Sequence, residues 1–323
     1  MHSGGTSNVR RGGPLGPLKK RHARLSERQD VMDIFQGCDE ILEKDKPLAP
    51  LTTFDIGGPA ECFLAPRSEE ELKDVLERCA KAELPIHVLG AGSNILVPDE
   101  GVKGAVIQLD ARGFGGFAVE EDRLRAGASL PLMKLVRGAA EAHLSGAEAL
   151  VGIPGWVGGA VKMNAGGAFG DIGQTVERVK VMSALGELFY REKDDLAFGY
   201  RTSNVSARFI LEVDLRLMED DEKSILKRTK EVWFHKKNTQ PVASRSAGCI
   251  FRNPRGMSAG ALIDQAGLKG AKVGGAAVSR KHANYIVAGQ ACSARDVREL
   301  IDLVRGRVHE RFDVYLELEI DIW

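Results

Sequence analysis

Cysteine is scarce in this sequence and is not arranged for metal or disulfide chemistry. The five cysteines of the 323-residue chain are scattered, and no Cys-x-x-Cys pair or Cys/His cluster occurs. A disulfide framework and a zinc site are therefore both disfavoured, and no metal site is expected. This cysteine usage is typical of a protein from a reducing compartment, and we expect a cytoplasmic location.

Net charge and long apolar runs are also missing. The 45 basic and 45 acidic side chains give a formal net charge of zero, so the protein has no bulk attraction to nucleic acid or to an anionic membrane. No apolar run is long enough to cross a bilayer, and the N-terminus lacks the apolar core of a secretory signal. We therefore expect no nucleic-acid partner and no membrane insertion. The oligomeric state is left open, and a monomer is compatible with the sequence.

A basic extension over residues 1–46 precedes the body of the protein. Up to about residue 28 it is rich in glycine, proline and basic residues, which is typical of a disordered tail. A short helix is expected over 31–45. An arm that binds nucleic acid is the alternative, but no aromatic residues are interleaved with the basic ones to support it.

One stretch contains far more glycine than a helix or a strand tolerates. Residues 152–167 include six glycines, separated mainly by apolar residues. The apolar neighbours argue against a flexible linker, which would be polar and rich in serine. Taken alone, the stretch fits equally well a set of tight turns in a loop-rich core or a backbone that lies against a flat or charged ligand.

A second glycine-containing loop, residues 89–97, follows a predicted buried strand at 85–89. The strand follows an amphipathic helix whose capping box pairs Ser68 with Glu71. Backbone N–H groups at the end of a strand can cradle phosphate. The loop is not a Walker A loop, because no Gly-Lys-Ser/Thr follows, and it lacks the third glycine of the dinucleotide-binding fingerprint. The two glycine stretches together favour a nucleotide-sized ligand held between them.

The remaining pattern mixes helices and strands without an internal repeat. The predicted elements are strands at 102–109, 176–182 and 209–217, and helices from Ser129, over 221–235 and from Ser293. Residues 314–322 alternate between apolar and polar and predict a strong terminal strand. Because helices and strands occur in segregated runs, an α+β fold is favoured over a doubly wound sheet.

Four residues could carry chemistry, although each also has a plain structural explanation. Arg201, next to Tyr200, could clamp a carboxylate or phosphate, or be an ordinary surface arginine. Cys249 is either a buried, inert thiol or a proton donor with an ordinary pKa of roughly 8.5. Glu319 is by default on a solvated strand face, whereas partial burial would raise its pKa and make it an acid. His282 could be a core histidine or a ligand contact.

In their order along the chain, these motifs resemble one family, the UDP-N-acetylenolpyruvoylglucosamine reductases (MurB), which are flavoenzymes of peptidoglycan precursor synthesis. The resemblance extends from about residue 47 to residue 323. The matching segments are 53–58, 89–97, 152–170, 200–203, 240–241, 246–254, 259–270, 279–284 and 316–320. Each motif is weak by itself, whereas the ordered set is specific.

The resemblance implies an α+β fold of the vanillyl-alcohol-oxidase (PCMH) type. An FAD-binding region would cover 47–218, in two subdomains of roughly 47–108 and 109–218. An α/β substrate-binding domain over 219–312 would be inserted before a C-terminal strand, 313–323, that returns to the active site. The short spacing after the Tyr-Arg pair resembles the form of the family that lacks an extra loop over the substrate.

Carried over residue by residue, the resemblance also implies a site with non-covalent FAD and with NADPH as the reductant. The implied FAD-binding residues are Gly90, Ala91, Gly92, Ser93, Asn94, Ile153, Gly155, Gly158, Gly159 and Arg201. The implied catalytic residues are Arg201, Cys249 and Glu319. The residues implied near the substrate are Tyr200, Lys237, Asn253 and His282. Trp156 departs from the family pattern, which often has a small residue after Ile-Pro-Gly.

The implied reaction is that of UDP-N-acetylmuramate dehydrogenase, the reduction of UDP-N-acetylglucosamine enolpyruvate to UDP-N-acetylmuramate. NADPH would reduce the flavin, and flavin N5 would deliver hydride to the enolpyruvyl CH2 carbon. Arg201 and Glu319 would stabilise the negative charge that develops, and Cys249 would supply the proton. Two alternatives stay open: another FAD-dependent oxidoreductase of the same fold, and a non-catalytic nucleotide-binding regulatory protein.

Overall fold

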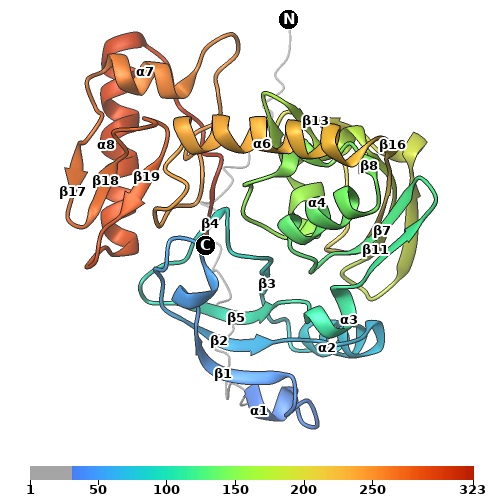
Figure 1. Cartoon of the computed structure of the whole chain (residues 1–323). Coiled ribbons are helices and arrows are strands. Elements are labelled where there is room, and N and C mark those ends of the chain that lie inside the picture. The colour runs from blue at the N-terminus through green and yellow to red at the C-terminus, as the bar shows by residue number, and fades with distance from the viewer. Residues whose placement is uncertain (1–30) are drawn as a thin grey trace, which may run out of the picture.

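The computed structural model describes residues 31–323, and the stretch predicted as a disordered tail lies outside the described residues. Three groups of elements surround a central region, where the C-terminal segment meets β4 (Ile95–Leu96) (Figure 1). None of the helices formed by residues 31–323 is long and apolar enough to cross a membrane.

The first group is a four-stranded sheet with the order β1-β2-β5-β3. Strand β1 (Leu42–Pro47) is antiparallel to β2 (Pro59–Leu64), whereas β5 (Val102–Ile107) is parallel to both β2 and β3 (Ile86–Val88). Helix α2 (Glu69–Lys81) connects β2 to β3. Its buried residues recur at the predicted helical spacing and are Leu72, Val75, Leu76 and Cys79.

The segment before this sheet is less helical than expected. Helix α1 (Val31–Ile34) has only four residues, and the last residues of the predicted extension form β1. The expected helix over 31–45 is therefore wrong beyond its first turn. Strand β1 forms because it pairs with a partner distant in sequence, and its exposed charged side chains suit the edge of a sheet.

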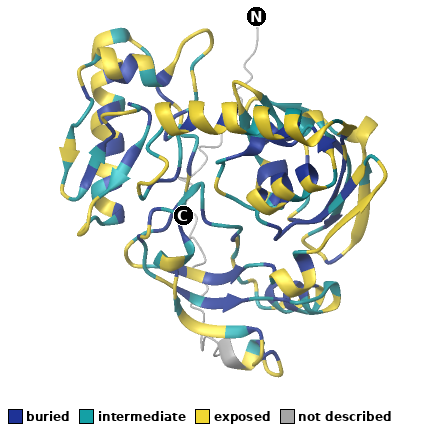
Figure 2. Ribbon diagram, viewed as in Figure 1, coloured by how far each residue is buried: buried dark blue, intermediate teal, exposed yellow. Residues whose placement is uncertain are grey.

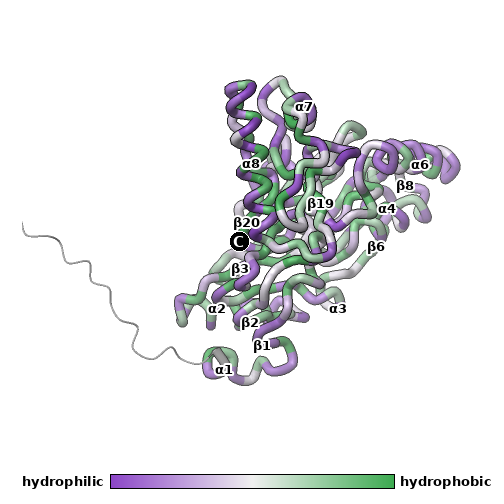
Figure 3. The backbone as a smooth tube through the Cα atoms, turned by 90° about the vertical axis from the view of Figure 1, so that its left-hand side faces the viewer, coloured by the Kyte–Doolittle hydropathy of each residue, from purple (hydrophilic) through white to green (hydrophobic). Residues whose placement is uncertain are grey.

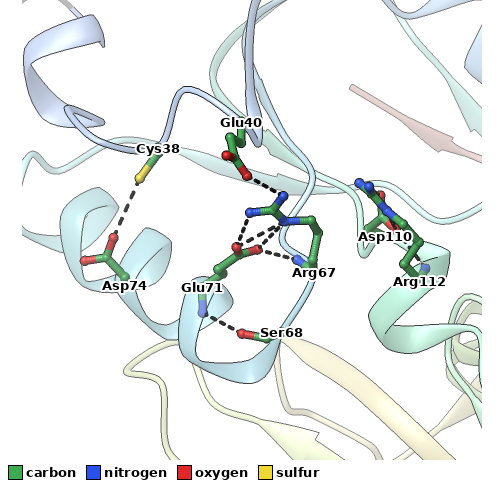
Figure 4. A network of polar contacts seen from close by, with 8 residues as sticks. All are labelled: Cys38, Glu40, Arg67, Ser68, Glu71, Asp74, Asp110 and Arg112. Carbon is green, nitrogen blue, oxygen red and sulfur yellow. Dashed lines mark hydrogen bonds and ion pairs between the residues drawn. The ribbon is translucent and has the colours of Figure 1, made fainter.

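The N-terminal end of α2 is held by a network of polar contacts (Figure 4). Ser68 Oγ accepts from Glu71 N at 3.2 Å, so Ser68 is the N-cap, but the predicted capping box is not completed because the Glu71 carboxylate accepts from Arg67 N and not from Ser68 N. The Glu71 carboxylate accepts from Arg67 N at 2.7 Å and from Arg67 Nη2 at 2.6 Å. Arg67 Nη1 also donates to Glu40 at 2.6 Å. The network thus ties the start of the helix to the segment that precedes β1.

The second group is an antiparallel five-stranded sheet with the order β12-β11-β15-β7-β6. Its strands are β6 (Phe117–Glu120), β7 (Arg123–Gly127), β11 (Val176–Met182), β12 (Leu188–Glu192) and β15 (Phe209–Arg216). One hydrophobic core runs without interruption through the first and second groups. The FAD-binding region expected from the sequence is therefore packed as one body.

Helices α5 (Val157–Lys162), α4 (Leu132–Glu141) and α6 (Glu222–Thr239) are stacked outward from the second sheet, and α5 packs directly on it. Helix α5 packs against β15, and α4 lies between α5 and α6. Buried residues concentrate in the sheet and in α4, whereas α6 is exposed along most of its length (Figure 2). Helix α6 falls within the range assigned to the substrate domain, yet its buried Val232 belongs to the core of the first two groups.

The third group contains two helices and a small sheet with its own core. Helices α7 (Ala259–Gln265) and α8 (Ala294–Phe312) pack with strands β17 (Lys272–Val273), β18 (Ala276–Val278) and β19 (Ile286–Ala288). Hydrophilic and hydrophobic bands alternate along α8, as expected for a helix that packs on one side (Figure 3).

Contacts between groups fix the start of α8. The predicted cap, Ser293, forms a full capping box with Asp296. Asp99, in the loop between β4 and β5 of the first group, also accepts from Ala294 N at 2.8 Å and from Arg295 N at 3.0 Å. A carboxylate of the first group therefore caps a helix of the third.

The C-terminal segment is not the single strand predicted at 314–322. Leu318 forms an isolated antiparallel bridge with Phe251, after which β20 (Asp321–Ile322) pairs in parallel with β4. Alternating polarity predicted the extended backbone correctly, but it could not show that the segment divides its pairing between two partners. The change of partner brings the third group, the first group and Glu319 together.

Candidate active site

Arg201 lies at the tip of a tight hairpin. Strands β13 (Phe198–Gly199) and β14 (Thr202–Ser203) pair antiparallel and leave two residues for the turn. Arg201 has a φ of 55°, a left-handed conformation that is uncommon outside glycine. Its Nε donates to Glu319 Oε1 at 2.6 Å, and its Nη1 donates to Gly166 O at 2.9 Å. The guanidinium therefore connects the glycine-rich stretch to the C-terminal segment.

Glu319 is buried although the alternating pattern places it on the polar side of the segment. Its side chain is 8% exposed, whereas Glu317 is exposed. Glu319 N donates to Ile250 O at 2.8 Å, and Asn94 Nδ2 donates to Glu319 O at 3.1 Å. Burial raises the pKa of the Glu319 carboxyl, and the opposing effect of Arg201 does not cancel it. Within residues 31–323 its Oε2 has no hydrogen-bond partner, so one oxygen can meet a ligand.

The segment that carries Cys249 is held by the side chain of Asn284. Asn284 Nδ2 donates to Phe251 O at 2.7 Å, and its Oδ1 accepts from Phe251 N at 3.0 Å. The backbone of Asn284 also accepts from Ile250 N at 2.8 Å. A buried amide thus fixes the backbone on the C-terminal side of the cysteine.

The environment of Cys249 keeps its thiol protonated. Burial raises the thiol pKa to about 12, nearby Glu319 adds to the rise, and Arg201 opposes it. An isolated antiparallel bridge places Tyr285 opposite Cys249, so both side chains lie on one face. Burial also raises the pKa of Tyr285. The predicted residues Arg201, Cys249 and Glu319 therefore form one cluster.

The loop after β3 presents backbone donors that the chain does not use. None of the backbone N–H groups of residues 90–94 has an acceptor in the described part of the chain. A Cβ at Gly92 would lie 2.0 Å from Leu51 O, and Gly92 has a φ of +62°, so this glycine is required by the loop itself. A Cβ at Gly90 would meet no atom within 4 Å and needs no unusual backbone conformation. Gly90 therefore borders open space.

The second glycine loop lies beside the first. A Cβ at Gly155 would be 3.4 Å from Ser93 Oγ, which places the two loops in contact. Gly158 packs closely, because its Cβ would lie 2.9 Å from Ala128 Cβ. Gly159 resembles Gly90, since a Cβ there would meet no atom within 4 Å. The other residues implied to bind FAD, Ala91 and Ile153, are half-buried in the same loops.

Of the residues implied near the substrate, Tyr200 lies in the turn of the hairpin and Asn253 lies next to it. Tyr200 is 52% exposed, and its hydroxyl accepts from Asn253 N at 3.3 Å. Asn253 Oδ1 accepts from Ala259 N at 3.0 Å, which fixes the turn before α7. Burial of part of the Tyr200 ring raises the pKa of its hydroxyl. Tyr200 can therefore present a neutral phenol to solvent or to a ligand.

His282 and Lys237 lie in different surroundings. The His282 ring is 4.9 Å from the ring of Tyr285, and its Nδ1 accepts from Asn284 N at 3.3 Å. Burial, and then Lys269, lower the pKa of His282, so the imidazole is neutral at neutral pH. Lys237 is exposed on α6, where its backbone carbonyl accepts from the side chain of Lys281.

Three residues around the site, Lys236, Asn284 and Tyr285, were not predicted from the sequence. Lys236 is 6% exposed, and it lies four residues after the buried Val232, so helical spacing could have placed it on the inner face. Asn284 is the last residue of the matching segment 279–284, in which His282 was the residue considered. Tyr285 follows that motif directly, but no local signal pairs it with Cys249.

Two protein-family models match the chain. A model described as "FAD binding domain" matches residues 60–190, and one described as "UDP-N-acetylenolpyruvoylglucosamine reductase, C-terminal domain" matches residues 240–323. The expected α+β, FAD-binding type of fold is therefore confirmed. Two observations of the site fit that cofactor. The N–H groups of residues 90–94 have no acceptor among the described residues, and Gly90 and Gly159 border open space although the packing of the chain does not require a glycine at either position.

Similar proteins agree with these matches. The UDP-N-acetylenolpyruvoylglucosamine reductase of Desulfosudis oleivorans is 41% identical over 314 residues, which cover 91% of this chain and 97% of the relative. The Bacillus subtilis reductase is 37% identical over 281 residues, covering 86% and 92%. The crystal structure of the Thermus caldophilus reductase matches with a TM-score of 0.75 and 41% identity, covering 87% of this chain and 98% of that one. The chain therefore belongs to the UDP-N-acetylenolpyruvoylglucosamine reductase family.

Proposed function

We propose that this protein reduces UDP-N-acetylglucosamine enolpyruvate to UDP-N-acetylmuramate, with NADPH as the reductant and non-covalent FAD as the cofactor. The observation that carries the proposal is the cluster of Arg201, Cys249 and Glu319, which three distant segments contribute in a chain of this family. The reaction is a step of peptidoglycan precursor synthesis and so of cell wall formation. We place it in the cytoplasm, where NADPH and sugar nucleotides are available.

The two glycine loops would hold the FAD. Loop 90–94 would offer its unused backbone N–H groups to the cofactor's phosphates, and loop 153–159 would offer the open side of Gly159. Arg201 would lie between the FAD held by the loops and the substrate. When bound, FAD supplies the hydride that it has taken from NADPH.

Arg201 and Glu319 would stabilise the charge that develops on the substrate. Addition of a hydride to the enolpyruvyl double bond places negative charge on the neighbouring carbon and its carboxylate. A guanidinium already held by Glu319 and Gly166 stabilises that charge without reorganising. Burial raises the pKa of Glu319, and in its protonated form the free Oε2 would donate a hydrogen bond to the substrate carboxylate instead of repelling it.

Cys249 would complete the reaction by donating its proton. Its thiol stays protonated at neutral pH, because burial raises its pKa to about 12. A carbanionic carbon is more basic than a thiolate, so the proton moves from Sγ to that carbon. One hydride and one proton are thereby added across the double bond, and the product is the saturated lactyl ether.

The exposed side of the cluster would receive the sugar nucleotide. Asn253 contacts Tyr200 in the turn of the hairpin, and His282 contacts Tyr285 and Asn284, which pair with the segment of Cys249. Lys237 is exposed on α6 and could meet a diphosphate. We propose these four residues as substrate contacts because Tyr200, Asn253 and His282 lie next to members of the cluster or their partners, and Lys237 contacts the third group through Lys281.

An anaerobic titration followed by flavin absorbance tests the proposed function. The flavin band should bleach with NADPH and return when the enolpyruvyl UDP-sugar is added. A band that returns only with oxygen would instead identify a flavoprotein oxidase. Failure to bind flavin after reconstitution with FAD would contradict the enzyme and leave a nucleotide-binding protein.

A further inference from the structure

A lysine of α6 is buried against the backbone that leads into the second glycine loop. Lys236 is 6% exposed, and its Nζ donates to Ala149 O at 2.9 Å and to Val151 O at 2.7 Å. The next residue, Gly152, has a φ of +73°, and a Cβ there would lie 2.9 Å from the Trp233 ring. The last turns of α6 therefore support the point at which the loop begins.

The same helix holds the segment before the loop at a second place. Arg228 donates to Glu148 Oε1 and to Ser145 Oγ at 3.0 and 3.1 Å, and to Asp220 at 2.6 Å. Glu148 in turn accepts from Gly146 N at 2.6 Å. Residues 145–151 are thus held along α6 by two cations, and the loop that follows begins from a fixed position.

Packing alone does not explain a lysine at this position. A buried ammonium loses its hydration, whereas a methionine of similar length would fill the space without that cost. Burial and the nearby positive charge of Arg201 lower the pKa of Lys236 to about 8. An ammonium can donate hydrogen bonds to two carbonyls and so fix the distance between them, which an apolar side chain cannot do.

We propose that Lys236 is a positioning residue that fixes the carbonyls of Ala149 and Val151 and thereby sets the path of the FAD-binding loop 152–159. It acts through the loop and not on the reacting atoms. The inference rests on the proposed function only in assigning FAD to this loop. The geometric part, the control of the loop by Lys236, can be tested without any cofactor.

Hydrogen exchange of the apoprotein tests the geometric part. Lys236→Met removes both donors, and amide exchange should become roughly tenfold faster in residues 149–159, with other segments unchanged. Lys230→Met is the matched control, because Lys230 is exposed on the same helix. Lys236→Gln keeps an NH2 donor, should restore part of the protection, and serves as the test if the methionine variant does not fold. Exchange that matches the wild type, or that accelerates throughout the second group, would overturn the proposal.

FAD affinity tests the functional part. Loss of a charge-assisted hydrogen bond corresponds to roughly a ten- to hundredfold change in an equilibrium constant. The dissociation constant of FAD should therefore be higher by up to that factor in Lys236→Met. The flavin absorption maximum should shift as well, whereas Lys230→Met should match the wild type in both readouts. Equal FAD affinity in Lys236→Met and wild type would contradict the positioning role. Absence of FAD binding in the wild type would contradict the proposed function instead, and the exchange experiment would still decide the role of Lys236 in shaping the loop.

Discussion

Two arginine–glutamate pairs in this protein have the same closest distance, but the pKa of the glutamate is shifted in opposite directions. Arg201 and Glu319 lie 2.6 Å apart at the candidate active site, and Arg67 and Glu71 lie 2.6 Å apart at the start of α2 (Figure 4). The pKa of Glu319 is raised, mainly by burial, whereas the pKa of Glu71 is lowered, mainly by its hydrogen bond from Arg67.

The difference shows that distance alone does not define an ion pair. The Glu71 side chain is 30% exposed and accepts from Arg67 through both oxygens. Glu319 is 8% exposed and is bonded through one oxygen only. The surface pair is a satisfied structural contact, whereas the buried pair keeps one oxygen without a hydrogen-bond partner among the described residues and a carboxyl whose pKa is raised. That combination suits a group that must meet a ligand.

The largest effect is expected at the thiol beside the buried pair. Cys249→Ala should slow reduction of the enolpyruvyl sugar by roughly 10²–10⁴-fold, because the proton donor is lost. Reduction of the flavin by NADPH should keep its rate. Stopped-flow absorbance measures the two half-reactions separately. Equal slowing of both would show that the thiol supports the cofactor rather than the substrate.

The two carboxylates should differ almost as strongly in catalysis. Glu319→Gln should lower the rate of substrate reduction by about 10²–10³-fold, since a group that stabilises the developing charge is altered. Glu71→Gln, the matched change in the surface pair, should leave that rate unchanged. The same stopped-flow assay compares them. A similar loss of rate in both variants would contradict the comparison, because it would mean that Glu319 affects the rate only by stabilising the fold.

The two pairs should also respond to pH with opposite signs. Glu319 binds its proton more tightly in the folded state than its ordinary pKa of 4.5 predicts, so its contribution to stability falls as pH rises above that value. Glu71 binds its proton less tightly, so its contribution is present above pH 4.5 and is lost as pH falls below it. Urea unfolding of wild type, Glu319→Gln and Glu71→Gln should be measured from below to above pH 4.5. The free energy of unfolding that wild type has in excess of Glu319→Gln should fall as pH rises, whereas its excess over Glu71→Gln should rise. Slopes of equal sign would contradict the burial argument.

The smallest effect is expected in the stability of the surface pair at neutral pH. Exposed ion pairs contribute little, so Glu71→Gln should lower the free energy of unfolding by about 0.5 kcal/mol. Chemical denaturation with intrinsic fluorescence measures the change. A loss of several times this size would mean that the contact between Arg67 and Glu40 depends on Glu71 as well.

Local patterns predicted those parts of the fold that depend on local physics. Ser68 and Ser293 cap α2 and α8 as expected, because a helix cap is decided within one turn of the chain. Strand β1 was missed, because its charged residues carry no alternating pattern and only the pairing with β2 defines it. The terminal strand was predicted as continuous, because sequence alternation does not record a change of partner.

The candidate site was found through the order of motifs rather than through the chemistry of single residues. Glu317 and Glu319 are equivalent in the alternating pattern, yet only Glu319 is covered by Arg201, by Asn94 and by the backbone of Ile250. These neighbours come from other segments, so burial of the carboxyl could not be read from its own surroundings in the chain.

Every contact that assembles the cluster joins distant parts of the chain. The pair of Arg201 and Glu319 spans 118 residues, and the bond from Asn94 to Glu319 spans 225. Closing such long loops costs entropy before any contact forms, so folding through them is slow. On refolding, helical circular dichroism should therefore return before turnover does. We expect the protein in that interval to have its secondary structure in place without the assembled cluster.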